Sequence, residues 1–89
     1  MNNGDILVYE TDELKWILIF EEWYRPYEGH IHYHALLVCP DEFYDRGTCC
    51  ILNEDCLRNS TDDEKQLLFD KIKENGYRWD SESIKLVKL

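Results

Sequence analysis

The sequence predicts a small α+β domain, in which a curved and mostly antiparallel sheet, open or barrel-like, is covered by one helix and followed by a β-hairpin. Three observations lead to this fold class. Short runs rich in aromatic and β-branched residues alternate with turn residues as far as Leu52. A single capping box marks one helix in the C-terminal half. With 89 residues the chain can build one thin core, so we expect a single domain over residues 1–89.

Four strands are predicted in the N-terminal part of the chain. A turn at Gly4 precedes the first strand, and the polar stretch 10–13 separates it from the second. Pro26, Gly29 and Pro40 mark the later breaks, because glycine suits turns and proline cannot donate to a strand ladder. The polar stretch 40–47, with two aromatic residues embedded in it, is predicted as a loop that packs its own rings. The predicted strands are residues 6–9, 16–24, 30–39 and 48–52.

One helix is predicted after these strands. Thr61 and Glu64 form the capping box, in which each side chain accepts a hydrogen bond from the backbone amide of the other. An apolar stripe follows, and Gly76 ends the helix, which places Tyr77 where it can pack back on Ile72. The last predicted strands, residues 77–79 and 84–89, flank a turn at 80–83.

The charge of the chain is unevenly distributed. The net charge is −9, with 15 acidic and 4 basic residues through Glu64, a net −11, and 4 acidic and 6 basic residues from Lys65 onward, a net +2. A strongly negative body repels phosphate backbones, so we expect no direct binding to nucleic acid. A basic protein partner fits this charge, although acidity can also serve only to keep a small protein soluble.

Apolar runs and cysteines bear on the compartment. Runs such as residues 16–20 are far shorter than a membrane-spanning helix, and no hydrophobic signal segment follows a basic N-terminus. We therefore expect a cytoplasmic protein that does not bind membranes. In that compartment the four cysteines are expected to be free thiols, and the adjacent pair would point to opposite faces of a strand. The cysteines are Cys39, Cys49, Cys50 and Cys56.

The two ends of the chain resemble a known group of proteins. Residues 67–80, LLFDKIKENGYRWD, resemble the ending LF-x-K-x-x-E-x-GY-x-WD of small uncharacterised proteins of Bacteroides-type gut bacteria and their phages. Residues 58–61, RNST, are similar to their R-P-A-T entry to the helix, with Asn59 and Ser60 in place of proline and alanine. Residues 4–7, GDIL, are similar to their GD-V-L strand opening. The resemblance implies a shared fold and a bacterial or phage origin, and it brings no catalytic residue.

Three histidines, the only ones in the chain, alternate along the third predicted strand. This spacing places His30, His32 and His34 on one face of a strand. Neighbouring members lie about 6–7 Å apart and can share a metal ion such as zinc, with a third ligand from a carboxylate or a cysteine of another segment. The outer two, about 13 Å apart, cannot reach one ion without a bulge. Alternatively, the histidines form the polar face of a half-exposed strand, or a contact surface that gains charge as the pH falls through about 6.5.

The sequence does not predict an enzyme. No cysteine is flanked by glycines in a turn that would expose a nucleophile, and no serine elbow motif occurs. Adjacent carboxylates such as Glu21-Glu22 and Asp41-Glu42 point to opposite faces of a strand, so they do not form a general acid and base pair. We assign no catalytic residue and no cofactor other than the zinc considered above.

Aromatic residues rimmed by acidic ones surround the turn between the second and third predicted strands. This composition suits a protein-contact patch, and core packing is the alternative for each ring. We therefore predict a non-enzymatic acidic protein-interaction module with an unknown, basic protein partner, and metal binding as the alternative. One form of this hypothesis is an inhibitor that occupies the basic nucleic-acid-binding surface of a host protein. The predicted contact residues are Glu21, Glu22, Trp23, Tyr24, Tyr27 and Tyr33.

Overall fold

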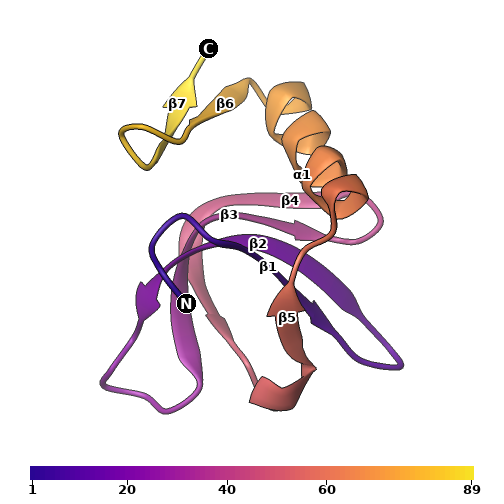
Figure 1. The fold of residues 1–89 in the computed structure, drawn as a ribbon, viewed down its shortest axis with the longest axis vertical. Coiled ribbons are helices and arrows are strands. Elements are labelled where there is room, and N and C mark those ends of the chain that lie inside the picture. The colour runs from indigo at the N-terminus through magenta and orange to yellow at the C-terminus, as the bar shows by residue number, and fades with distance from the viewer.

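The computed structural model describes residues 1–89 and contains two sheets and one α-helix (Figure 1). A five-stranded antiparallel sheet has the order β4-β3-β2-β1-β5, and β6 pairs with β7 in a separate hairpin. The predicted α+β class, with one helix and a final hairpin, is confirmed. The elements are β1 (Ile6–Glu10), β2 (Lys15–Trp23), β3 (His30–Val38), β4 (Glu42–Cys50), the 3₁₀ helix η1 (Glu54–Cys56), β5 (Leu57–Asn59), α1 (Asp62–Glu74), β6 (Tyr77–Asp80) and β7 (Lys85–Lys88).

The five-stranded sheet is strongly curved but remains open (Figure 1). Its edge strands, β4 and β5, pair only with β3 and β1, respectively. The barrel-like form of the prediction is therefore wrong. The physical reason is the length of β5, because its three residues are too few to pair with the nine residues of β4 and close a ring of strands.

Strand β4 is the largest difference between the predicted and the observed elements. Residues 40–47 are predicted as a loop, yet β4 begins at Glu42 and pairs with β3, with Phe43 opposite Leu37. Most side chains of this edge strand face solvent and need no apolar character, so its polar sequence resembles that of a loop. The short strand β5 carries no sequence signal either, and it is held by pairing with β1.

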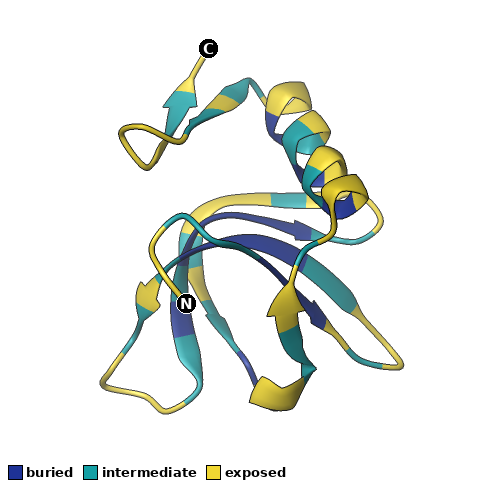
Figure 2. Cartoon of the chain, in the orientation of Figure 1, coloured by how far each residue is buried: buried dark blue, intermediate teal, exposed yellow.

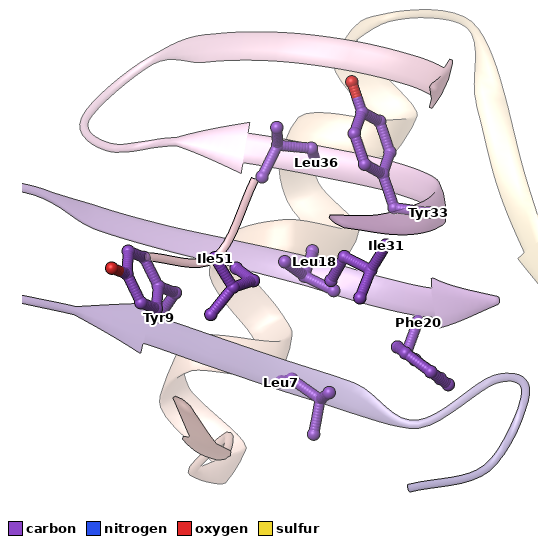
Figure 3. Packing of buried hydrophobic residues seen from close by; sticks show 8 residues of the cluster. All are labelled: Leu7, Tyr9, Leu18, Phe20, Ile31, Tyr33, Leu36 and Ile51. Atoms are coloured by element: carbon purple, nitrogen blue, oxygen red, sulfur yellow. The ribbon is translucent and has the colours of Figure 1, made fainter. Parts of the chain in front are cut away.

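The sheet buries one hydrophobic cluster on each face. Leu68 and Ile72 of α1 pack on one face, which confirms the predicted apolar stripe, and Ile51 closes the cluster on the other face (Figures 2 and 3). The helix-side cluster is Val8, Ile17, Ile19, Ala35, Leu37, Leu68 and Ile72. The opposite cluster is Leu7, Tyr9, Leu18, Phe20, Ile31, Tyr33, Leu36 and Ile51.

An irregularity in the pairing of β2 with β3 changes which side chains face the helix. Ile19 pairs with Ala35 and Phe20 pairs with Tyr33, so His34 has no regular partner on β2. In an undisturbed strand, residues 33 and 35 would share a face. Here Tyr33 joins the cluster opposite the helix, whereas Ala35 joins the helix-side cluster. The bulge therefore bends the sheet at His34.

The C-terminal hairpin is fastened to both the helix and the sheet. Gly76 has φ +84°, a left-handed conformation that ends α1, and its carbonyl accepts a hydrogen bond from the amide of Leu89 at 2.8 Å. The Tyr77 hydroxyl donates to Asp45 Oδ2 of β4 at 2.8 Å, and the Tyr77 ring lies beside Phe43. The hairpin thus packs over the end of the sheet where β3 bends.

A buried carboxylate joins the helix to three strands. Glu64 is 6% exposed and accepts hydrogen bonds from both terminal nitrogens of Arg58 at 2.8 Å and from Lys15 Nζ at 2.7 Å. The predicted capping box is present, with Glu64 Oε1 accepting from the amide of Thr61 at 2.9 Å. Arg58 also binds Glu10 of β1. These charges hold the start of α1 against β1, β2 and β5.

Candidate functional site

The three histidines of β3 have separate partners. His30 Nδ1 donates to the carbonyl of Glu28 at 3.1 Å, and His32 Nδ1 lies 2.7 Å from the hydroxyl of Thr48. His34 is 7% exposed, and its Nε2 donates to Asn3 Oδ1 at 2.7 Å. No group of three histidine, cysteine, aspartate or glutamate side chains in the structure is arranged to hold a metal ion.

His34 belongs to the contact between the sheet and the C-terminal hairpin. Its ring centroid lies 5.0 Å from that of Trp79 of β6. Burial lowers the pKa of His34, partly opposed by the charge of Glu21 on β2 and reinforced by that of Arg46 on β4. The environment therefore favours the neutral imidazole, which acts as a packing and hydrogen-bonding group.

His30 and His32 form an aromatic row with two tyrosines of the β2–β3 turn. Tyr24 stacks on His32 with a centroid distance of 4.8 Å, and it also meets Tyr27 edge to face at 5.5 Å. Tyr27 in turn lies 5.5 Å from His30 and is 60% exposed. Two backbone hydrogen bonds hold the turn, one from the amide of Tyr24 to the carbonyl of His30 and one from the amide of Tyr27 to the carbonyl of Tyr24. The row thus presents ring faces and edges to solvent.

A hollow lies beside this row. It has a volume of about 490 Å³ and adjoins a second hollow of about 410 Å³, with which it shares Glu28, Gly29 and Glu54. We call the two together the acidic furrow, since its shared carboxylates come from the β2–β3 turn and from η1. The first hollow is lined by Trp23, Tyr24, Arg25, Tyr27, Glu28, Gly29 and Glu54, and the second by Glu28, Gly29, Cys50, Ile51, Leu52 and Glu54.

Gly29 allows the two walls of the furrow to approach each other. It has φ +76°, and its carbonyl accepts a hydrogen bond from the amide of Ile51 at 2.6 Å. A Cβ atom at position 29 would lie 2.7 Å from the carbonyl oxygen of Ile51. Only glycine fits both the conformation and the space. Beyond Ile51, Asn53 caps η1 by accepting a hydrogen bond from the amide of Asp55, and this places Glu54 in the furrow.

The structure divides the predicted contact residues into two groups. Tyr24 and Tyr27 are in the aromatic row, Trp23 lines the furrow while packing against Phe20, and Glu22 is exposed nearby. Glu21 is half-buried and lies on the side of His34.

Tyr33 is not a contact residue, which corrects the prediction. It is 6% exposed, because on β3 it shares a face with Ile31 and packs in the cluster opposite the helix. Its hydroxyl lies over Gly47 of β4, where a Cβ atom would come within 2.7 Å. Burial raises the pKa of Tyr33, so the phenol remains neutral.

Sequence reasoning missed the two carboxylates of the furrow. Glu28 is in a predicted turn but does not stand out among 19 acidic residues. Glu54 reaches the furrow only because the chain folds back after β4, and that return depends on the contact between Gly29 and Ile51. The one signal in the sequence was Gly29 at the end of the turn.

The cysteines offer little chemistry at this site. All four are free thiols, and Cys50 lies at the edge of the furrow. Burial raises the pKa of Cys49 to about 12, so its thiolate, the form that binds metals and attacks electrophiles, is scarce at neutral pH. The exposed side chains of the furrow also include Arg25 and Leu52, but its rings and its two carboxylates together suit recognition of a cation.

Comparisons of the chain with protein-family models, with curated proteins and with solved structures found no match. The resemblance of the two ends of the chain to Bacteroides-type and phage proteins therefore stays a prediction. The only α-helix, α1, has 13 residues, and no helix in the structure has the length and apolar character needed to cross a membrane.

Proposed function

We propose that the protein is a non-enzymatic interaction module that binds a basic segment of a partner protein in the acidic furrow. The observation that carries the proposal is the placement of Tyr24 and Tyr27 beside Glu28 and Glu54 in one hollow. An arginine or lysine side chain over a tyrosine face gains about 0.5–1 kcal/mol at an exposed site, and a carboxylate within reach adds a charge-assisted hydrogen bond.

The charges of the furrow support a cationic ligand. Glu28 and Glu54 are exposed and form no ion pair in the structure, so both are free to meet a partner. Arg25 also lines the first hollow and leaves one net negative charge there. Arg25 should therefore select for ligands that approach from the side of the two glutamates, because like charges repel.

The wider charge distribution suggests the kind of partner. The net charge of −11 through Glu64 attracts a strongly basic surface, and such surfaces on other proteins commonly bind nucleic acid. We therefore extend the proposal to an inhibitor of bacterial or phage origin, acting in the cytoplasm, that occupies a basic nucleic-acid-binding surface of a host protein. The resemblance of residues 67–80 to phage and gut-bacterial proteins supports this origin.

Fluorescence anisotropy with a labelled arginine-rich peptide tests the furrow directly. The wild-type protein should bind this peptide with an affinity that falls as the salt concentration rises from about 0.05 to 0.3 M. It should not bind a peptide with glutamine in place of arginine. The double variant Glu28→Gln/Glu54→Gln should lose at least about ten-fold in affinity, and Tyr27→Ala about three-fold.

A charge-matched control separates the furrow from general acidity. Asp12→Asn/Glu13→Gln removes the same two negative charges from exposed residues of the β1–β2 turn, and it should change affinity by less than about two-fold. Equal losses in the two double variants would show that only the overall charge attracts the peptide, and the proposed site would be wrong. The inhibitor hypothesis further requires that an oligonucleotide compete with the protein for whatever partner it captures from a Bacteroides-type lysate.

Metal binding at His30, His32 and His34 remains the alternative function. Its support is weaker, because His34 is buried in the contact with the hairpin, and the other two histidines belong to the aromatic row. The effect of a chelator on stability, given in the Discussion, tests it.

A further inference from the structure

A second, chemically different pocket is formed by the C-terminal part of the chain, outside the acidic furrow. Figure 1 shows the hairpin of β6 and β7 leaving the C-terminal end of α1. The pocket has a volume of about 330 Å³ and is lined by residues of the C-terminal half of α1, of β6 and of the chain end. Five of its seven lining residues are hydrophobic, and none is acidic. The lining residues are Phe69, Ile72, Lys73, Tyr77, Arg78, Trp79 and Leu89.

The two cations of this pocket, Lys73 and Arg78, have no partners. Arg58, Lys15 and Lys71 each form an ion pair in the structure, whereas neither Lys73 nor Arg78 is paired with any acidic group. Both are exposed, and they belong to the part of the chain from Lys65 onward, which carries a net charge of +2 within a protein of net charge −9. The pocket is thus a positively charged site on an acidic protein.

We propose that this pocket binds a small ligand with an apolar body and one anionic headgroup, either a carboxylate or a phosphate. Phe69, Ile72 and Trp79 would cover the apolar body, and removing that surface from water drives binding. Arg78 and Lys73 at the rim would receive the headgroup through charge-assisted hydrogen bonds. A volume near 300 Å³ is at the small end of ligand sites, which favours a compact molecule over a protein segment.

Nuclear magnetic resonance titration of the ¹⁵N-labelled protein tests the proposal with four ligands of equal chain length. Octanoate and octyl phosphate should shift the Trp79 indole and Tyr77 amide signals in a saturable way, and their relative affinities identify the preferred headgroup. Octanol should bind at least about ten-fold more weakly, and octylamine should not bind, because the cations repel it. Signals of the acidic furrow should stay unchanged with octanoate, octyl phosphate and octanol, which keeps this test independent of the proposed function. Octylamine is a cation that the furrow itself can bind, so only the signals of the pocket are compared in that titration.

Conservative variants assign the headgroup contact. Arg78→Gln and Lys73→Gln, both at exposed positions, should each weaken octanoate binding by about ten-fold. Lys85→Gln on β7 makes the same change of charge outside the pocket and should weaken it by less than about two-fold. Equal affinity for octanol and octanoate, or equal losses in Lys85→Gln and Arg78→Gln, would overturn the proposal. So would shifts of the Trp79 signal that follow protein concentration instead of ligand, since a second copy of the chain would then occupy the pocket.

Discussion

Replacing Glu64 with glutamine should destabilise the protein strongly, although it changes only one atom of the side chain. In the native structure the Glu64 carboxylate is 6% exposed and accepts hydrogen bonds from Arg58, Lys15 and the amide of Thr61. The side-chain oxygen of glutamine can still accept the hydrogen bond of the capping box. Its NH₂ group, however, is a donor and would face Arg58 or Lys15, which are donors as well. The substitution therefore tests the charge and not the helix cap.

The magnitude of the destabilisation follows from the hydrogen bonds that the substitution removes. A hydrogen bond to a charged group contributes about 1.5–3 kcal/mol to stability, and at least two such bonds are broken or weakened. The side chains of Arg58 and Lys15 are 42% and 33% exposed, so water can replace part of the hydrogen bonding that these two cations lose in the variant. We expect the free energy of unfolding to fall by about 3 kcal/mol, which corresponds to a decrease in melting temperature of about 12–24 °C for a domain of this size.

Urea unfolding at pH 7, followed by tryptophan fluorescence, measures this change. The matched control is Glu10→Gln, which removes the same charge from the other partner of Arg58, 2.9 Å away, at a side chain that is 45% exposed. That variant should lose less than about 0.5 kcal/mol, because exposed ion pairs contribute little. If Glu64→Gln loses no more than Glu10→Gln, the buried carboxylate does not stabilise the fold and the reasoning is wrong.

The pH dependence gives a second check on the same residue. Hydrogen bonds from Arg58, with a further contribution from Lys15, hold the pKa of Glu64 far below its ordinary value. A carboxyl whose pKa is lower in the folded than in the unfolded state contributes its full stability above the unfolded pKa of about 4.3. That contribution is lost as the pH falls from there toward the folded pKa. The wild type should therefore lose stability below about pH 4.5 more steeply than Glu64→Gln.

Three further predictions concern other parts of the fold. The pKa of His34 is lowered in the folded state, so its contribution to the free energy of unfolding is full above about pH 6.5. Below that pH the contribution is lost, by at most about 1.4 kcal/mol per pH unit. In urea unfolding, His34→Gln should therefore show a shallower pH dependence of stability than the wild type between about pH 7 and 5.5. Gly29→Ala should destabilise the fold by about 2–3 kcal/mol and abolish peptide binding in the acidic furrow. The control is Gly76→Ala, which has a similar φ but no atom within 4 Å of the added Cβ, and it should cost about 1 kcal/mol. Equal losses of stability in the two variants would exclude a clash between residue 29 and Ile51. Adding EDTA to protein purified without chelator should leave the melting temperature unchanged and mass spectrometry should find no bound zinc, while stoichiometric zinc and a large shift would favour the metal site.

Local signals in the sequence predicted the elements whose residues satisfy one another nearby. The capping box of Thr61 and Glu64 and the left-handed Gly76 lie within or next to the helix that they delimit, so the bounds of α1 follow from short-range chemistry. The capping box did not reveal, however, that Glu64 is also the buried partner of Arg58 and Lys15. That role requires β1, β2 and β5 to meet at the start of α1.

The errors arose where long-range pairing decides the structure. Residues 42–47 have the polarity of a loop, and only pairing with β3 makes them a strand. Tyr33 was assigned to the surface because it lies near the aromatic residues of the β2–β3 turn, and His34 because it alternates with His30 and His32. Both are buried, Tyr33 in the cluster opposite the helix and His34 at the bulge, beneath the C-terminal hairpin. The aromatic row could be anticipated from the tyrosines near the β2–β3 turn. Its acidic wall at Glu54 could not, because it depends on a fold-back that no local pattern encodes.

The open edge of β4 has a consequence for the behaviour of the protein in solution. Alternate residues of this nine-residue strand present unpaired backbone donors and acceptors at the edge, which is a template onto which a strand of another molecule can add. Glu42 and Asp45 lie on this edge, and Arg46 has φ +30°, which interrupts the regular strand geometry. Repulsion between the carboxylates of two molecules should therefore oppose pairing of their β4 strands edge to edge. The acidic residues of β4 would thus protect the protein against aggregation through the open edge of its sheet.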